Sequence, residues 1–454
     1  MSSGVLTEPT TPDGAQAFRL SFPQERIWFT EQLNPGRAGL TISTALHVHG
    51  ELDPAAFRAA LAALVARHEA LRTRFVARRT GPVQEVLPHA EVPFDVVDLR
   101  GEPAPDDLSG LLVRHLDTTF DLTAAPLLRA RLLRLADGYS VLLLAIHHII
   151  CDGLSADILL RDLTALYRAA RTGTPADLPE LGLQYPDFAE WQRDTIDERV
   201  IAAQLDYWER ELAGTSGLVD LPTDHPRAAA GDVGGALVSR MLPGSLCARL
   251  VEVARQAQAS PFMLLLAAYQ VVLARTSGRG DFCVGTSIGA RSQHELSGVL
   301  GCFINLLALR SDTTGDLTLR ELLTAVRTRC LRAYGQADVP FARGVARLAP
   351  GRSGQGRTPL FEVLLAVQDG RTGAFEVGGA TLTPELVAVP AAQFDLALDV
   401  QIDAGGASLV LCYATGIFSA ATAERFLDRI ERVLAAFAAD ADQRLSAVDL
   451  ATPV

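Results

Sequence analysis

Apolar and polar positions alternate along the chain with two periods, one typical of helices and one of buried strands. After Asp53-Pro54, apolar side chains recur every three or four residues, and the aspartate cap and the proline predict the start of a helix. Residues 140–148 are apolar up to two histidines, which predicts a buried strand. The turn Asp152-Gly153 follows, and residues 155–170 carry a helical pattern. The first half therefore predicts helix, strand and helix.

The second half of the chain shows the same alternation. Ser260-Pro261 begins a predicted helix, which ends in the glycine-rich turn 277–280 before a short strand at 282–284. The other expected elements are a helix from the capping box of Thr318 and Glu321 to Arg332, strands over 391–402 and 407–413, and a helix over 420–437. This alternation predicts an α/β protein with two lobes, each a two-layer sandwich of helices on a sheet.

The length indicates more than one domain. A chain of 454 residues with 48% hydrophobic positions exceeds what one core of ordinary size buries, so we expect two or three domains. Residues 1–18 are rich in Thr, Pro, Gly and Ser and predict a disordered leader, while 350–358 predicts a mobile loop. We expect an N-terminal lobe over 19–185, an interlobe connection over 186–235, with 213–235 its best part, and a C-terminal lobe over 236–454.

Composition excludes several classes of function. All 41 lysine-or-arginine positions are arginines, so Schiff-base and P-loop lysine chemistry are excluded. A net charge of -12 argues against nucleic-acid binding. No apolar run spans a bilayer and no secretory signal is present, so we expect a cytoplasmic protein that does not bind membranes. The six cysteines form no C-x-x-C pair, which predicts reduced thiols and no metal site.

The adjacent histidines at the end of the predicted strand are the first candidates for chemistry. His147 and His148 would point to opposite faces of a strand, so they are poor joint ligands for one metal ion. Asp152 lies across a turn that Gly153 permits. An imidazole on a rigid strand end titrates near neutrality and suits proton transfer. The alternative is a pair of buried histidines with ordinary hydrogen bonds.

A second candidate motif is Gly-Thr-Ser-Ile-Gly at 285–289, which matches the nucleophile elbow of α/β-hydrolases with Ser287 as nucleophile. That fold requires an acid and then a histidine after the serine, and the last histidine, His294, follows too closely. We therefore favour a small-residue strand end near a cleft. Arg67-His68-Glu69 ends the first helix, and we expect it to be a solvated helix end of mixed charge.

Together, the motifs resemble the condensation domains of nonribosomal peptide synthetases, from about residue 19 to 440. Seven segments appear in the family's order: 20–28 (LSFPQERIW), 67–75 (RHEALRTRF), 147–153 (HHIICDG, matching HHxxxDG), 185–192 (YPDFAEWQ), 301–305 (GCFIN), 338–341 (DVPF) and 357–361 (RTPLF). The sequence departs from the family pattern at Leu154, Leu306, Gln336-Ala337 and Ala342. The acceptor-side departures favour an acceptor that is not tethered to a downstream module.

The resemblance implies a fold and a set of site residues. The fold would be that of chloramphenicol acetyltransferase, with two lobes forming a V-shaped pseudo-dimer and the signature histidine in a tunnel between them. By position, His148 would be the catalytic histidine. The residues His147, Asp152 and Gly153 would be structural at the active site, with Arg291 as the partner of Asp152, and Ser287 and Asn305 would line the substrate tunnel.

The resemblance also implies a reaction of natural-product, including antibiotic, biosynthesis. An aminoacyl or acyl group would arrive on the phosphopantetheine arm of a separate peptidyl carrier protein, with no cofactor bound to the enzyme. A small-molecule or carrier-tethered amine or hydroxyl would accept it, giving an amide or an ester. The initial methionine and the end at Val454 predict a free-standing enzyme. The alternatives are an acyl-CoA-dependent acyltransferase of the same superfamily and a non-catalytic recruitment module.

Overall fold

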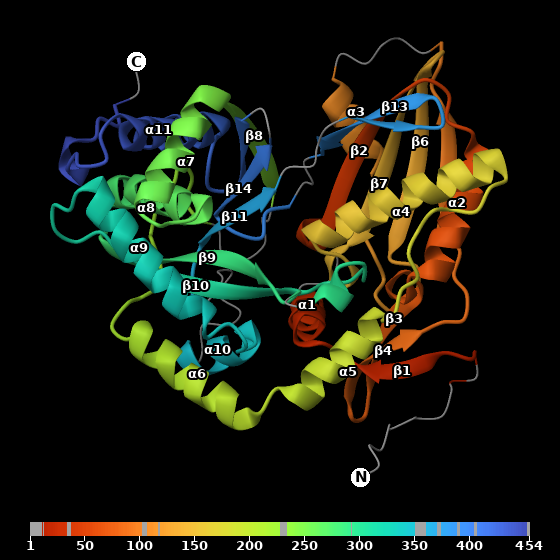
Figure 1. The fold of residues 1–454 in the computed structure, drawn as a ribbon, viewed down its shortest axis with the longest axis horizontal. Coiled ribbons are helices and arrows are strands. Elements are labelled where there is room, and N and C mark those ends of the chain that lie inside the picture. The colour runs from red at the N-terminus through yellow and green to blue at the C-terminus, as the bar shows by residue number, and fades with distance from the viewer. Residues whose placement is uncertain are drawn as a thin grey trace. The chain divides into compact units, whose positions relative to one another are not determined.

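The chain folds into two compact units, each built from segments that are separate in the sequence. The computed structural model describes residues 11, 13–33, 38–101, 107–116, 119–227, 234–291, 293–349, 360–369, 374–387, 391–403 and 406–451. Unit 1 comprises Met1–Ile196, Gly289–Ile304 and Arg371–Val389, and unit 2 comprises Asp197–Ile288, Asn305–Gly370 and Pro390–Val454. Both units combine helices with a six-stranded sheet (Figure 1), which confirms the predicted α/β class with two lobes.

Unit 1 is organised around a sheet whose central strand leads to the histidines. The strand order is β12 (Phe375–Val377), β13 (Ala380–Leu386), β2 (Thr41–His49), β7 (Tyr139–His147), β6 (Leu128–Ala136) and β5 (Phe94–Asp98). All neighbours are antiparallel except β5 and β6. Leu142 and Leu144 enter one hydrophobic cluster while Val141 and Leu143 enter another, so β7 is buried on both faces. This burial explains its unbroken apolar sequence.

Helices and a small second sheet complete unit 1. Its helices are α1 (Phe22–Leu33), α2 (Pro54–Arg67), α3 (Leu108–His115), α4 (Gly153–Thr172) and α5 (Tyr185–Thr195). The three-stranded sheet has the order β1 (Gln16–Arg19), β4 (Gly81–Val86) and β3 (Thr73–Arg78). Helices α2 and α4 pack against each other, and α1 packs against the short turn that follows β7. That contact brings the first helix of the chain to the histidine segment.

Two late segments of the chain belong to unit 1, which differs from the contiguous C-terminal lobe expected over 236–454. Strand β13 pairs with β2 along its whole length, so the backbone groups of β2 are not left as an exposed edge. The segment 289–304 is held by polar contacts to α4 described below. These long-range pairings have no sequence period, and a contiguous division could not foresee them.

Unit 2 repeats the plan with a mixed sheet of order β10 (Ile304–Asp312), β9 (Asp281–Gly289), β11 (Val363–Asp369), β14 (Leu396–Asp403), β15 (Gly406–Ala414) and β8 (Gly235–Pro243). Its helices are α6 (Glu198–Glu211), α7 (Gly244–Gln256), α8 (Pro261–Ser277), α9 (Leu319–Tyr334), α10 (Phe341–Leu348) and α11 (Ala420–Ala439). Figure 1 shows α7, α8 and α11 together on one side of this sheet. Helix α8 is buried on nearly all sides and forms the centre of that layer.

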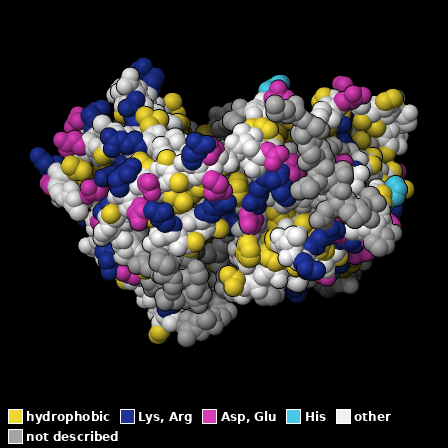
Figure 2. Space-filling model, turned by 90° about the horizontal axis from the view of Figure 1, so that it is seen from below, with side chains coloured by type: hydrophobic (Ala, Val, Ile, Leu, Met, Phe, Trp, Pro, Cys, Tyr) yellow, Lys and Arg dark blue, Asp and Glu magenta, His cyan; other side chains and the backbone are white. Residues whose placement is uncertain are grey.

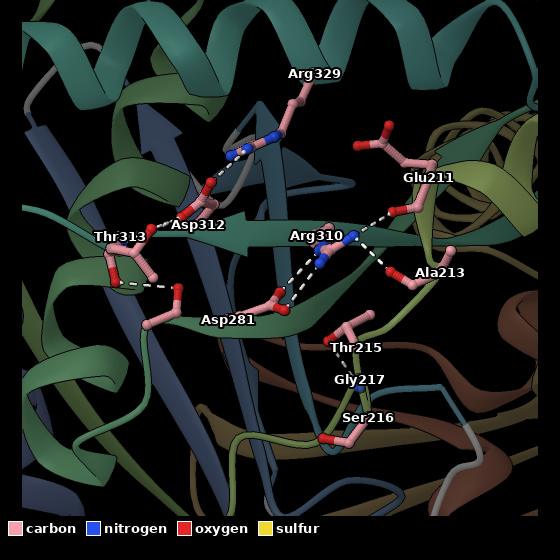
Figure 3. Close-up of polar contacts among 12 residues, drawn as sticks. Glu211, Ala213, Thr215, Ser216, Gly217, Asp281, Arg310, Asp312, Thr313 and Arg329 are labelled. Atoms are coloured by element: carbon pink, nitrogen blue, oxygen red, sulfur yellow. Dashed lines mark hydrogen bonds and ion pairs between the residues drawn. The ribbon is translucent and has the colours of Figure 1, made fainter.

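An arginine fixes the end of α6 to the sheet of unit 2. Arg310, on β10, makes two hydrogen bonds to the carboxylate of Asp281 on β9, at 2.8 and 2.9 Å. Its remaining terminal nitrogen donates to the backbone carbonyls of Glu211 and Ala213, at 2.9 and 3.1 Å (Figure 3). Residues 212–217, which follow α6, are thereby tied to the two neighbouring strands.

Most predicted elements are confirmed. Asp53 caps α2, and its carboxylate accepts from the N–H of Ala55 at 2.9 Å. Ser260 caps α8, and Thr318 and Glu321 form the expected capping box of α9. The strand expected from residue 391 begins only at Leu396, and the loop expected over 350–358 lies outside the described residues.

Three expectations were wrong. Residues 16–18, assigned to the disordered leader, belong to β1, which pairs with β4, whereas residues 1–10 and 12 lie outside the described residues. The expected interlobe connection over 186–235 is largely helical, because it contains α5 and α6. The Arg67-His68-Glu69 segment is not a solvated helix end: His68 is buried, and its Nε2 lies 2.9 Å from the buried carboxylate of Asp162.

The surface carries both signs of charge. Figure 2 shows arginines interspersed with carboxylates on one face, where the described side chains form pairs such as Arg347 with Glu209 at 2.7 Å and Arg343 with Glu198 at 2.8 Å. Within the described ranges, no single helix has the length and apolar character needed to cross a bilayer. Only α7 and α8 taken together, joined at a bend of 102°, meet that test by length and composition.

Candidate active site

The central strand of unit 1 ends at the first of the two histidines. The N–H of His147 donates to the carbonyl of Leu127 at 3.0 Å, and its Nδ1 accepts from the N–H of Ile149 at 3.1 Å. Its Nε2 lies 3.6 Å from the buried carboxylate of Glu31. Both ring nitrogens therefore face protein groups, and His147 shapes the turn that follows the strand.

His148 is the first residue of the 3-10 turn η3 (His148–Ile150), not a strand residue as expected. The two histidines are therefore separated by the change from strand to turn rather than by strand alternation. The Nδ1 of His148 is buried and meets no hydrogen-bonding group of another described residue, but its own backbone carbonyl acts on it as an acceptor. A proton on Nδ1 leaves the lone pair on Nε2, and the residue is partly exposed. Nε2 is thus the nitrogen available to accept a proton.

The surroundings of His148 keep its imidazole neutral. Burial, first, and the positive charge of Arg26, second, lower the pKa of His148 to about 4, against the smaller opposing effects of Asp152 and of its own carbonyl. A histidine with this pKa is uncharged at pH 7, which is the form that can act as a general base. The neighbouring thiol of Cys151 is unsuited to nucleophilic attack, because burial raises its pKa well above the ordinary value.

Asp152 has a structural position. It caps α4, where its Oδ1 accepts from the N–H of Ser155 at 2.8 Å, and its Oδ2 accepts from the N–H of Phe303 at 2.9 Å. The Nη2 of Arg291 lies 3.3 Å from Oδ1. Only 3% of Asp152 is exposed, and each carboxylate oxygen already has a partner. The structure therefore brings Asp152 and Arg291 together and gives the carboxylate no hydrogen bond to the imidazole of His148 among the described contacts.

Arg291 is saturated by hydrogen bonds. Its Nη1 donates to the carbonyls of Leu296 and Val299, both at 2.7 Å, and its Nη2 donates to the Oγ of Ser155 at 2.6 Å. The guanidinium lies 3.8 Å from the centroid of the Phe303 ring. Arg291 therefore fastens the segment 289–304 to the N-terminus of α4. Gly153, predicted to be structural, is the first residue of that helix.

Two residues that the sequence analysis gave no role complete this network. Ser155 is fully buried and binds both backbone groups of Gly301, donating to its O at 2.6 Å and accepting from its N–H at 3.1 Å. Tyr185 donates to the carbonyl of Cys302 and contacts the Oγ of Ser21 at 2.7 Å. A Cβ on Gly301 would lie 1.8 Å from the ring of Tyr185, so only glycine fits there. The motif matches at 185–192 and 301–305 carried a signal for this contact, but spacing alone did not.

Arg26 is the second arginine near the histidine, and the sequence analysis included it only as part of a motif. Its Nε is buried without a hydrogen-bond partner, and its terminal nitrogens make no hydrogen bond or ion pair with any residue in the described part of the chain. Burial lowers its pKa, and no carboxylate opposes that effect. The helix that carries it, α1, packs against η3. An unpaired guanidinium thus acts directly on His148.

The predicted tunnel residues lie in unit 2. Ser287 is a partly exposed residue within β9, not a sharp strand-to-helix turn, so the nucleophile-elbow geometry is absent there. The amide of Asn305 donates to the carbonyls of Ala337 and Val339, at 2.9 and 2.7 Å, and accepts from the N–H of Phe341 at 3.1 Å. Asn305 therefore fixes the turn that leads into α10.

Unit 2 also contains a cavity of about 470 Å³. Residues 212–217, Cys283 and Arg347 line it, together with Ala349 and Leu360. The last two residues border 350–359, which lie outside the described residues, so the cavity's full boundary is not defined. Over the described ranges of the chain, no group of three or more His, Cys, Asp or Glu side chains has the arrangement of a metal site.

Comparison with known proteins assigns the chain to a family. The family profile named Condensation domain matches residues 15–454. A linear gramicidin synthase of Brevibacillus parabrevis is 36% identical over 458 residues, covering 100% of this chain but 9% of the synthase. Two further linear gramicidin synthases of the same organism are each 37% identical, and the matches cover 8% and 6% of them. The chain therefore spans less than a tenth of the length of these relatives.

Solved structures agree with this assignment. The complex of the X-domain and OxyB from teicoplanin biosynthesis contains a chain that superposes with a TM-score of 0.84 and 30% identity, covering 100% of both chains. SgcC5 from Streptomyces globisporus, in complex with (R)-(-)-1-(2-naphthyl)-1,2-ethanediol and sucrose, superposes with a TM-score of 0.75 and 30% identity, covering 92% of this chain and 98% of that one. With an HHxxxDG segment, a neutral histidine and a profile match over nearly its whole length, this chain belongs to the condensation-domain family of nonribosomal peptide synthetases, whose members are acyl or peptidyl transferases.

Proposed function

We propose that this domain transfers an aminoacyl or acyl group from a phosphopantetheine thioester on a carrier protein to an amine or hydroxyl acceptor, with His148 as general base. The observation that carries the proposal is a partly exposed, neutral imidazole whose Nδ1 is turned into the protein and whose Nε2 has no partner among the described residues. A thioester is already activated, so the protein has to supply only positioning, a base and stabilisation of developing charge.

The reaction follows from these positions. The acceptor N–H or O–H attacks the thioester carbonyl, its proton passes to Nε2 of His148, and the carbonyl electron pair moves to oxygen. Collapse of the tetrahedral centre expels the carrier thiolate, which takes the proton back from His148. General-base catalysis contributes about 10²–10⁴-fold. The backbone N–H of Gly153 at the N-terminus of α4 is a candidate donor to the oxyanion.

The acceptor is proposed to be a soluble small molecule as well as, or instead of, a carrier-bound amine. The departures at Leu306, Gln336-Ala337 and Ala342 support this, and so does SgcC5, a relative whose structure holds a diol. An alcohol depends on the base more than an amine does, because a hydroxyl stays protonated near neutrality. The ester-forming reaction should therefore lose more on removal of the imidazole than the amide-forming one.

A donor and acceptor matrix tests the proposal. One aminoacyl group is offered as a carrier thioester, as a CoA thioester and as an N-acetylcysteamine thioester, each with a free amine, a free alcohol and an aminoacyl-loaded carrier. Mass spectrometry follows the product. We expect the carrier-bound donor to be the best, and a soluble acceptor to give product. Equal turnover of the CoA thioester would support the acyl-CoA alternative, and transfer only to the second carrier would overturn the soluble-acceptor claim.

A second candidate function is docking of another protein without catalysis. The observation that favours it is the likeness to an X-domain that forms a complex with OxyB. The same matrix separates the two functions. No transfer above background with any donor, in a protein that still binds a carrier or a partner enzyme in a calorimeter, would favour docking.

A further inference from the structure

Arg26 is a partly buried cation that no described residue neutralises. Removing a charge from water costs several kcal/mol unless a partner restores the lost interactions. The arginines nearby obey this rule: Arg291 bonds to Asp152 and Ser155, and Arg193 bonds to Glu25 at 2.7 Å. The side chain of Arg26, one position after Glu25, has no such partner within the described ranges. A folded protein keeps an uncompensated charge of this kind mainly at functional sites.

The position of Arg26 says what would compensate it. Helix α1 packs on η3, and Arg26 is the neighbouring charge with the largest effect on His148. The other groups that act on this imidazole are Asp152, His147 and its own carbonyl. In an acyl transfer at His148 the one new negative charge forms on the carbonyl oxygen, next to the nitrogen or oxygen whose proton His148 takes. A guanidinium is a strong donor to such an oxyanion.

We propose that Arg26 contacts the acyl carbonyl of the donor and stabilises the oxyanion that forms during transfer, which makes it a second catalytic residue beside His148. This inference rests on the proposed acyl transfer. The electron pair of the carbonyl moves to oxygen facing Arg26 while the acceptor proton moves to Nε2 of His148, and both return when the thiolate leaves. Negative charge on the oxygen also offsets the field of Arg26 at the imidazole. The base therefore becomes stronger only while the tetrahedral centre exists.

The test compares Arg26→Met and Arg26→Lys with a matched control, Arg193→Met. Arg193 lies next in space to the same motif and packs 4.1 Å over the Phe22 ring, but it is ion-paired with Glu25. Arg26→Met should lower kcat about 10²–10³-fold, the loss typical of one oxyanion donor, with a small change in KM. Arg26→Lys should retain part of the rate because it keeps the charge. Arg193→Met should leave kcat within a few-fold.

Two readouts need no substrate and would not follow from a structural role. The melting temperature of Arg26→Met should rise by a few degrees, because an unpaired charge is removed from a largely apolar setting, whereas that of Arg193→Met should fall. NMR titration of labelled histidines should show the pKa of His148 moving up from about 4 in Arg26→Met, because a nearby positive charge is lost. The acid limb of the pH–rate profile should move upward with it.

The outcomes separate this inference from the proposed function. If the wild-type protein shows no transfer with any thioester, the function fails, whatever the variants do. If the wild type transfers and a folded Arg26→Met is active within about threefold, or melts lower as Arg193→Met does, the role of Arg26 is overturned.

Discussion

Two arginines approach the histidine segment of unit 1, and they differ in every contact. Both terminal nitrogens of Arg291 are engaged by the carbonyls of Leu296 and Val299, by Ser155 and by Asp152. Arg26 has none of these partners in the described chain. A saturated guanidinium has nothing left to offer a ligand, whereas an unsaturated one does. The contrast indicates that the arginine paired with the signature aspartate holds the fold and that the unpaired arginine serves the reaction.

The largest expected effect comes from removing the group that both arginines surround. His148→Ala should lower transfer about 10²–10⁴-fold with a hydroxyl acceptor, because the base is lost, and less with an amine. The fold should survive, since Nδ1 bonds to no other described residue. Product formation and a melting curve are measured together. Full activity in a folded variant would show that His148 is not the base.

Breaking the saturated pair should cost stability rather than chemistry alone. Asp152→Asn leaves Arg291 as a second unpaired buried charge and places an amide where two donors, Arg291 and the N–H of Ser155 or Phe303, now converge. The expected loss is about 3–5 kcal/mol in the free energy of unfolding, measured by denaturant titration. An unchanged unfolding midpoint would show that the pair does not hold the segment 289–304.

The unpaired arginine also predicts a pH dependence of stability. The pKa of His148 is about 4 in the folded protein and about 6.5 in an unfolded chain, so the unfolded state binds a proton first as pH falls. The stability contributed by this group is fully present above pH about 6.5 and is lost as pH falls toward 4, by up to about 3 kcal/mol. A His148→Gln variant should show a shallower fall over this interval. Parallel curves for both proteins would contradict the low pKa.

The smallest expected effect probes the packing around Arg291 without changing a charge. Gly301→Ala forces a methyl group against the buried ring of Tyr185, at a cost of about 1–3 kcal/mol from overpacking. Gly289→Ala is the matched control, because a Cβ there meets nothing within 4 Å. Equal unfolding free energies for the two variants would show that the Tyr185 ring can move aside.

The sequence predicted what repeats locally and missed what is held from afar. The caps at Asp53, Ser260 and Thr318 predicted helix starts well, because a cap is a contact between residues a few positions apart. The strand leading to His147 was correct because burial on both faces makes it uniformly apolar. The turn at His148 was missed, since a strand that changes to a 3-10 turn leaves no mark in hydropathy.

The site was predictable only as far as the motif matches reach. Position within the family pattern pointed to His148, Asp152 and Arg291, and the structure brings the last two into contact. Ser155 and the unpaired state of Arg26 could not be foreseen, because both depend on which groups from distant segments arrive beside them. The addition of β12 and β13 to the sheet of unit 1 belongs to the same class of long-range pairing.

The most direct test of the contrast is the free energy of unfolding of Arg26→Met and Arg291→Met, measured side by side at pH 7 with their rates of transfer. We predict opposite signs for stability: Arg26→Met unfolds at a higher denaturant concentration than the wild type and loses most of its rate, whereas Arg291→Met unfolds at a lower one because Asp152 is left unpaired. If both variants were destabilised to a similar extent, Arg26 would be a structural residue like Arg291, and the distinction between them would be wrong.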